Sequence, residues 1–393
     1  MGMSHPFSMG RKMRLYKDKI VKGIFVSRPN RFVAKAEIDG QVVLCHMPNP
    51  GRMRELLFPG TVLYVIKNHS AQNKTAYKVV GVEREGVPIL LDTVRANDVA
   101  EYLVNTHKIP GWESCRVLRR EVTMGDSRFD MLLLNEGTGE IFPVEVKSCT
   151  LFGSKGAMFP DAVTARGRKH VEHLGRLAEQ GEHAGVLFLV QWPRAEWFLP
   201  DFHTDPEFAE TFSKYMDKLD WKAAAISWND HFELPESVRL LPSSHEVIEE
   251  ENREYGNFLL VLHNKQSLFW SEHTALLAGY YLYIGSSAGK LTTLENSFRR
   301  KRKTCRNPVD RLRAACELEG VITLRSSGNN AESIRKRLIQ AGGKPVTLTD
   351  ESGQALCFYY RDNPMETRAF SEVELFFAID MLNGRMSRAK VKE

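Results

Sequence analysis

Short apolar stretches of strand length alternate with turn-forming residues over the first ninety positions of the chain. Asp39-Gly40 separates two of these stretches and is typical of a tight hairpin turn. Several short strands at this spacing predict a small OB-like β-barrel, which we place at residues 13–92. The expected strands are residues 20–26, 32–38, 42–46 and 61–66.

Longer apolar runs and one helical period appear between residues 93 and 228. Residues 129–134 and 141–147 are strand-like, and the turn-rich link between them predicts a β-hairpin. A further strand is expected before the hairpin, at residues 116–122. Val171, Leu174 and Leu177 recur at helical spacing, and residues 184–190 are apolar enough for a strand buried on both faces. The expected order is three strands, a helix and a strand.

The composition changes again after residue 228. Proline, serine and a run of glutamates predict a linker at residues 229–253. A third domain is expected over residues 254–345, with strand-like residues 255–262 and 279–287 and a helix at 331–341. Residues 346–393 are treated as a C-terminal extension. The predicted fold class is therefore a multidomain protein of α/β and α+β type.

The composition fits folded domains in a reducing compartment. Of 393 residues, 42% are hydrophobic and 10% aromatic, which is typical of globular cores. No run approaches the roughly eighteen apolar residues that a membrane span needs, so we expect no membrane partner. The first residues lack the pattern of a signal peptide, and the six cysteines form no C-x-x-C pair. We therefore expect a cytoplasmic protein.

The positive charge is concentrated in one segment. The net charge is +5, but Phe298 to Arg313 holds eight basic residues and one acidic residue, an excess of +7, so the rest sums to −2. A polyanion would meet that segment first.

The predicted hairpin carries the candidate chemistry. Side chains alternate along a strand, so Glu145 and Lys147 share one face while Val144 and Val146 fill the other. If the register is right, Asp130 of the preceding strand brings a second carboxylate to the same spot. Carboxylate oxygens suit Mg²⁺ or Mn²⁺, and Lys147 would face a phosphate or an attacking water. The other interpretation is that Glu145 and Lys147 are ordinary solvated residues.

Three further polar motifs accompany this site, at residues 28–32, 46–53 and 159–170. Together with Ser127-Arg128-Phe129-Asp130 and Val144-Glu145-Val146-Lys147, they resemble the sugar fermentation stimulation protein family over residues 13–228. Pro50 departs from the family pattern. The resemblance implies a barrel-like domain joined to a PD-(D/E)xK nuclease domain, with DNA-binding or nuclease activity. Asp130, Glu145 and Lys147 would be catalytic, and Asp130, Glu145 and the Val146 carbonyl would bind the metal.

The same motifs supply basic side chains for nucleic acid. Arg28, Arg31 and Arg52 can donate hydrogen bonds to phosphate oxygens, although the adjoining Pro-Asn and Pro-Gly elements also suit plain turns with solvated arginines. Arg128 precedes the hairpin site. Arg166, Lys169 and His170 crowd the start of the predicted helix, where free amide donors also favour anions.

Residues 254–325 resemble GIY-YIG nuclease-like domains less completely. Phe258 stands where the first motif of that family often has a tyrosine, and Ser297 stands where the family has an arginine on a helix. No metal-binding glutamate can be placed. Tyr283 is as compatible with the core as with catalysis. We expect a degenerate, nucleic-acid-binding module. Its contacts would be Arg299, Arg300, Lys301, Arg302 and Lys303.

These observations predict a Mg²⁺- or Mn²⁺-dependent nuclease that hydrolyses phosphodiester bonds of DNA or RNA, with DNA the favoured partner. One alternative is a non-catalytic DNA-binding regulatory protein on a nuclease scaffold. In another, the C-terminal domain is the active nuclease.

Overall fold

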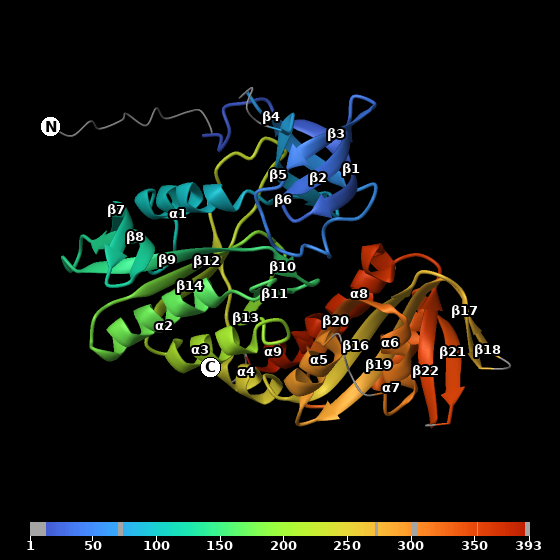
Figure 1. Ribbon diagram of the computed structural model, residues 1–393. Helices are drawn as coiled ribbons and strands as arrows, with labels where there is room; N and C mark the ends of the chain where they lie inside the picture. The colour runs from blue at the N-terminus through green and yellow to red at the C-terminus, as the bar shows by residue number, and fades with distance from the viewer. Residues whose placement is uncertain (1–12, 70–73, 272–273, 301–304, 352, 390–393) are drawn as a thin grey trace.

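The computed structural model describes residues 13–69, 74–271, 274–300, 305–351 and 353–389. Three sheets, each with its own strand order, dominate it. In Figure 1 the barrel (blue) lies above the other two parts, the central sheet (green) lies to the left, and the C-terminal sheet (orange to red) lies to the right.

The first part is a closed barrel, as the strand spacing predicted. Its strands follow the order β3-β2-β1-β4-β5-β6, and a parallel pairing of β3 with β5 closes the sheet on itself. Asp39 and Gly40 both have positive φ (52° and 76°), as a two-residue type I′ hairpin turn requires. The strands are β1 (Val21–Asn30), β2 (Val33–Ile38), β3 (Gln41–His46), β4 (Val62–Lys67), β5 (Tyr77–Arg84) and β6 (Val87–Leu90).

The central sheet has the predicted order of three strands, a helix and a strand. Its strand order is β15-β14-β12-β9-β8-β7, with β7, β8 and β9 antiparallel and β9, β12 and β14 parallel. Every residue of β12 is buried, because helices cover both faces. The elements are η1 (Thr93–Arg95), α1 (Ala96–Asn105), β7 (Cys115–Met124), β8 (Ser127–Asn135), β9 (Ile141–Cys149), α2 (Ala165–Glu179), β12 (Gly185–Val190), α3 (Pro206–Tyr215) and β14 (Asp220–Ala225).

The segment expected to be a linker, residues 229–253, is folded. It contains β15 (Arg239–Leu240), which pairs with β14, and α4 (His245–Glu251), capped by the Ser244 side chain. Val247 and Ile248 of α4 are buried in the core of the central part. The polar composition was misleading because α4 is amphipathic: Glu246 and Glu249 are exposed, whereas Glu251 is buried and accepts hydrogen bonds from Ser327. A small sheet completes this part: β10 (Leu151–Phe152), β11 (Gly156–Phe159) and β13 (Trp197–Pro200).

The C-terminal part is one antiparallel sheet with helices on both faces. The strand order is β20-β16-β19-β22-β21. One core lies between the sheet and α5 and α6, and a second lies between the sheet and α7 and α8. The predicted boundary at residue 345 falls within β21, so it divides a single sheet. The elements are β16 (Tyr255–Asn264), β17 (Leu268–Ser271), β18 (Thr274–Leu276), β19 (Gly279–Ala288), α5 (Leu291–Arg299), α6 (Pro308–Ala315), β20 (Glu317–Arg325), α7 (Ala331–Gln340), β21 (Lys344–Asp350), β22 (Gly353–Tyr360), η2 (Pro364–Glu366), α8 (Arg368–Ala378), η3 (Asp380–Leu382) and α9 (Asn383–Ala389).

The last helices tie the C-terminal part to the central part, as Figure 1 shows for α8 and α9. Ile379 and Met386 belong to the same buried cluster as Trp197 of β13. The Trp197 Nε1–H donates to Asn383 Oδ1 at 2.9 Å, and Ser154 bonds Asp380. Residues 153–155, which link β10 to β11, therefore contact the C-terminal part. No helix within the described residues is long and apolar enough to span a membrane.

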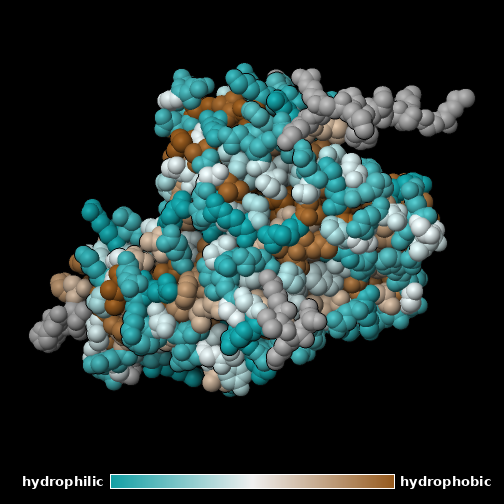
Figure 2. All heavy atoms as spheres, turned by 180° about the vertical axis from the view of Figure 1, so that it is seen from behind, coloured by the Kyte–Doolittle hydropathy of each residue, from teal (hydrophilic) through white to brown (hydrophobic). Residues whose placement is uncertain are grey.

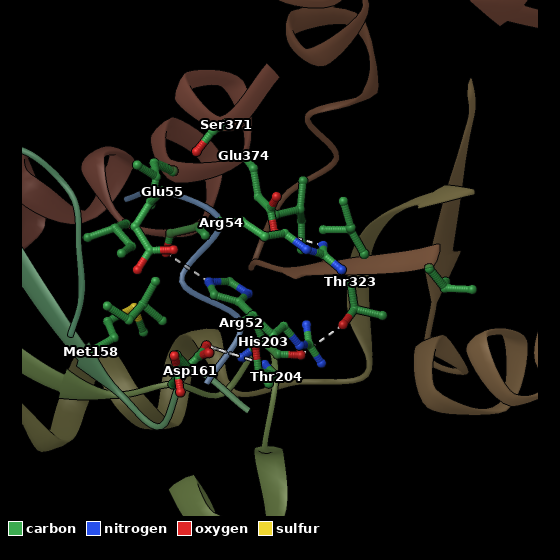
Figure 3. Close-up of a pocket in the computed structure, with 18 of the residues that line it drawn as sticks. Arg52, Arg54, Glu55, Met158, Asp161, His203, Thr204, Thr323, Ser371 and Glu374 are labelled. Carbon is green, nitrogen blue, oxygen red and sulfur yellow. Dashed lines mark hydrogen bonds and ion pairs between the residues drawn. The ribbon is translucent and has the colours of Figure 1, made fainter. Parts of the chain in front are cut away.

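A polar cavity of about 70 Å³ lies where the three parts meet, and we call it the junction cavity. Figure 3 shows Arg54 and Glu55 from the barrel side, Asp161 from the central part and Glu374 from α8 around it. Glu55 is 8% exposed, and its Oε1 has no hydrogen-bond partner. Burial, together with the charge of Asp161, raises the pKa of Glu55 to about 8. The junction thus contains a carboxyl group that resists ionisation.

Candidate metal and nucleic-acid site

Asp130 and Glu145 lie where two paired strands separate. The β8–β9 ladder runs from Leu134↔Ile141 to Met131↔Val144 and stops one step before these residues. Beyond that point the Val146 N–H donates to Asp130 Oδ2 at 2.8 Å instead of to a strand carbonyl. Asn97 of α1 donates to Asp130 Oδ1, also at 2.8 Å. Both carboxylate oxygens of Asp130 are therefore held in place.

Glu145 is almost completely buried, with 3% of its surface exposed. Its Oε1 accepts two hydrogen bonds of 2.5 Å, one from Lys147 Nζ and one from His170 Nδ1 of α2. Its Oε2 is buried and has no hydrogen-bond partner. Lys147 and Glu145 thus share a face of β9 as the alternation predicted, while Val144 and Val146 fill the opposite core. An unpartnered buried carboxylate oxygen is costly unless a ligand satisfies it.

The two carboxyl groups differ electrostatically. Burial acts to raise the pKa of Glu145, but hydrogen bonds from His170 and Lys147 outweigh it and lower the pKa below its ordinary value. Burial and the charge of Glu145 raise the pKa of Asp130, against the bonds from Val146 and Asn97. Since each charge disfavours the other, a cation between them would favour the ionised form of both.

The donor set fits a hard divalent cation that keeps part of its water shell. Among the described residues no group of three or more His, Cys, Asp and Glu side chains has metal-binding geometry. The candidate set is smaller: the carboxylates of Asp130 and Glu145 and the Val146 carbonyl. Mg²⁺ is commonly held by one or two carboxylates, with water and substrate oxygens filling the other positions. The free Glu145 Oε2 is the observation that favours this fit.

The basic residues predicted near this site are mostly paired. Arg128 forms an ion pair with Glu121, and Lys169 Nζ lies 2.7 Å from Asp126 Oδ2. Arg166, at the start of α2, is exposed. Thr164 accepts from the Gly167 N–H and thereby caps this helix. The exposed pairs contribute little free energy, so Arg128 and Lys169 remain available to a polyanion.

Arg28 has a structural environment that the sequence did not reveal. Its Nη atoms donate to the carbonyl oxygens of Asn49, Gly51, Arg52 and Arg31 at 2.7–3.0 Å. All four Nη hydrogens are thus directed at backbone. The Gly51 N–H donates to Asn49 Oδ1, which confirms the turn interpretation of that pair. A Cβ on Gly51 would lie 2.1 Å from Asp161 Oδ2, so two of the three polar motifs meet between the barrel and the central part.

The other barrel arginines lie on accessible surface. Arg31 is exposed, and its guanidinium lies 4.7 Å from the centre of the exposed Phe32 ring. Arg52 is exposed at the rim of the junction cavity. Several apolar side chains of β1 and β3 also face solvent, and Figure 2 shows brown apolar surface at the top of the molecule, where the barrel lies. These apolar residues are Ile24, Val26, Val42 and Leu44.

The two C-terminal strands that resemble GIY-YIG motifs, β16 and β19, carry apolar side chains and a buried asparagine, Asn257, which donates to Ser286 and Asn329. Phe258 of β16 packs on Phe298 and Tyr283, with ring centres 5.4 and 6.1 Å apart. Burial raises the pKa of Tyr283. Arg299 is paired with Glu295 at 2.7 Å, and Arg300 is exposed. Lys301, Arg302 and Lys303 lie outside the described residues.

Two residues of the site were missed by sequence reasoning. His170 was assigned to the basic surface at the helix entrance, but it is 5% exposed and bonds Glu145. Its spacing from Val171 and Leu174 places it on the buried face of α2, so its burial could have been predicted from the helical period. Asn97 reaches Asp130 from a helix thirty-three residues earlier, and nothing in its local sequence indicates that contact.

A closed barrel followed by a sheet with this carboxylate site defines an OB domain joined to a restriction-endonuclease-like domain. The model of the SfsA N-terminal OB domain matches residues 26–91, and that of the sugar fermentation stimulation protein RE domain matches residues 94–229. Together these matches span just over half of the chain, which belongs to the sugar fermentation stimulation protein family. The C-terminal sheet lies outside both.

Proteins similar to this chain are also described as sugar fermentation stimulation proteins. A sugar fermentation stimulation protein homolog of Methanothermobacter thermautotrophicus is 38% identical over 194 residues, covering 49% of this chain and 80% of that protein. The homolog of Pyrobaculum arsenaticum is 43% identical over 189 residues, covering 48% and 79%. Among solved structures, Pyrococcus furiosus SfsA in complex with Ca²⁺ is 29% identical with a TM-score of 0.51, covering 59% of this chain and 99% of that one.

Proposed function

We propose that this protein is a divalent-metal-dependent nuclease that hydrolyses phosphodiester bonds of DNA or RNA. The observation that carries the proposal is the buried Glu145, whose Oε2 has no hydrogen-bond partner. Asp130 lies beside it, where β8 and β9 separate. A buried carboxylate with one unpartnered oxygen, next to a second carboxylate, is suited to a cation ligand.

In this proposal Asp130, Glu145 and the Val146 carbonyl hold Mg²⁺ or Mn²⁺. Once bound, the cation supplies Lewis-acid stabilisation of negative charge on the scissile phosphate. The Lys147 ammonium orients the attacking water or donates to the phosphate oxygens, since its side chain is only partly buried. The Pyrococcus furiosus relative in complex with Ca²⁺ supports a divalent cation in this family. Ca²⁺ and Mg²⁺ both prefer oxygen ligands.

Nucleic acid would approach the site along its basic rim. Arg128, Arg166 and Lys169 lie on the exposed side of β8 and α2. The barrel adds Arg31, with Phe32 beneath it, and Arg52. Guanidinium groups contact phosphates, and a guanidinium stacked on an aromatic ring also suits unpaired bases. Arg28 contributes by shaping the Asn49–Arg52 loop.

We further propose that the C-terminal sheet is a degenerate GIY-YIG-like module that binds nucleic acid without cutting it. Its two signature strands, β16 and β19, are adjacent and antiparallel. Phe258, which stands where the resemblance would put a tyrosine hydroxyl, packs instead on the ring of Phe298. The basic stretch from Arg299 to Lys303 would supply the phosphate contacts.

The test is cleavage of labelled single- and double-stranded DNA and RNA in Mg²⁺, Mn²⁺ or EDTA. Wild type, Glu145→Ala and Glu172→Ala are compared, because Glu172 is an acidic residue of α2 paired with Arg176 and away from the site. We expect metal-dependent cleavage by wild type and Glu172→Ala, and none by Glu145→Ala, with binding nearly intact. Equal loss of cleavage and binding in Glu145→Ala would contradict the assigned role.

A non-catalytic DNA-binding regulator is the second candidate. The small donor set, with no group of three ligating side chains among the described residues, favours it. It predicts that the protein binds DNA in a salt-dependent way but cleaves it in the presence of no metal ion. Neutralising Arg299 and Arg300 should then make the binding constant depend less steeply on salt concentration. If the C-terminal sheet were the nuclease instead, cleavage would survive Glu145→Ala.

A further inference from the structure

The Glu145 carboxylate is bonded asymmetrically, and its partners come from different elements. Lys147 lies two residues along the same strand, whereas His170 lies on α2 and packs against the sheet. Both donors bond Oε1, and neither bonds Oε2. Because an ionised carboxylate only accepts hydrogen bonds, His170 Nδ1 carries its hydrogen toward Glu145, which the neutral ring can do.

His170 is held more rigidly than Lys147. The residue is 5% exposed, and its ring packs edge-on against Phe129 of β8, with ring centres 5.8 Å apart. Val171 and Leu174, on the same buried face of α2, are fully buried in the core. Lys147 has a flexible four-carbon side chain that is 15% exposed. We therefore expect His170 to fix the orientation of the Glu145 carboxylate, and the flexible Lys147 side chain to adjust to that orientation.

We propose that His170 is a positioning residue that fixes the Glu145 carboxylate so that Oε2 faces the metal position. The inference rests on the proposed function, since it requires Glu145 to be a metal ligand. It also explains how Lys147 can be released. When the ammonium turns toward a phosphate, Glu145 Oε1 keeps its bond from His170, so the buried carboxylate is not left without a donor.

The test measures Mn²⁺ binding to the full chain by calorimetry, without nucleic acid. We compare wild type with His170→Ala, His170→Asn and His173→Ala. An asparagine amide can reproduce the donor at the Nδ1 position. His173, one helical turn on, also contacts Phe129 but has no bond to Glu145, so it serves as the matched control. Thermal unfolding of each variant reports whether it remains folded.

We expect His170→Ala to weaken Mn²⁺ binding by about 10–100-fold, the usual cost of removing a partner that orients a metal ligand. His170→Asn should recover most of that loss, and His173→Ala should bind like wild type. Unchanged Mn²⁺ affinity in folded His170→Ala, or equal loss in His173→Ala, would overturn the positioning role alone. Failure of wild type to bind Mn²⁺ would overturn the proposed function with it.

Discussion

Replacing Glu55 by glutamine should change the pH dependence of stability, because this carboxyl is buried in the junction cavity. Its pKa rises from its ordinary value of 4.5 to about 8, first through burial and then through the charge of Asp161. The charges facing it come from the barrel side (Arg52, Arg54, Arg84), the central part (Asp161, Asp201) and the C-terminal part (Glu295, Glu374).

The sign follows from proton binding. The folded chain binds the Glu55 proton more tightly than the unfolded chain does, so the stabilisation is complete below pH 4.5 and is lost as the pH rises through 8. At 1.36 kcal/mol per pKa unit, this shift corresponds to a change of about 5 kcal/mol in the free energy of unfolding between low and high pH. That figure is a ceiling, since water entering the cavity would solvate the ionised carboxylate.

The assay is urea unfolding followed by tryptophan fluorescence at pH 5, 7 and 9. Glutamine has nearly the same shape but cannot ionise, so Glu55→Gln should gain stability over wild type as the pH rises, by up to the ceiling at pH 9. Glu37→Gln, on the exposed face of β2, should follow wild type. Parallel pH profiles for wild type and Glu55→Gln would refute the reasoning.

Two further substitutions test how the C-terminal part is attached. Ile379→Ala removes a side chain with no exposed surface at the junction and should cost about 2–5 kcal/mol, whereas Ile339→Ala, half exposed on α7, should cost far less in the same urea titration. Gly156→Ala would place a Cβ 2.1 Å from Trp197 Cζ2 and 2.6 Å from Ile379 Cγ2, so we expect a loss of about 1–3 kcal/mol. Gly384→Ala, with open space at its Cβ, is the control, and equal melting temperatures for the two glycine variants would contradict the packing argument.

The sequence predicted much of the local structure, because that structure depends on alternation and turn chemistry. The barrel strands, the Asp39-Gly40 hairpin, the β8–β9 pair and the buried strand β12 are all readable from residues close together in the chain. The pairing of Glu145 with Lys147 followed from the two-residue period of a strand. The linker at residues 229–253 failed as a prediction because composition does not show which face of a polar helix is buried.

Only the tertiary structure decided which distant residues meet. His170 and Asn97 reach the two carboxylates from helices twenty-five and thirty-three residues away in sequence, and the packing of those helices determines the contacts. Arg28, for which the sequence allowed either a phosphate contact or a place in a turn, donates to carbonyl groups of a loop about twenty residues on. A strand's period determines which side chains share a face. Whether a charge on that face meets solvent, a partner or an unsatisfied carboxylate depends on what packs against it.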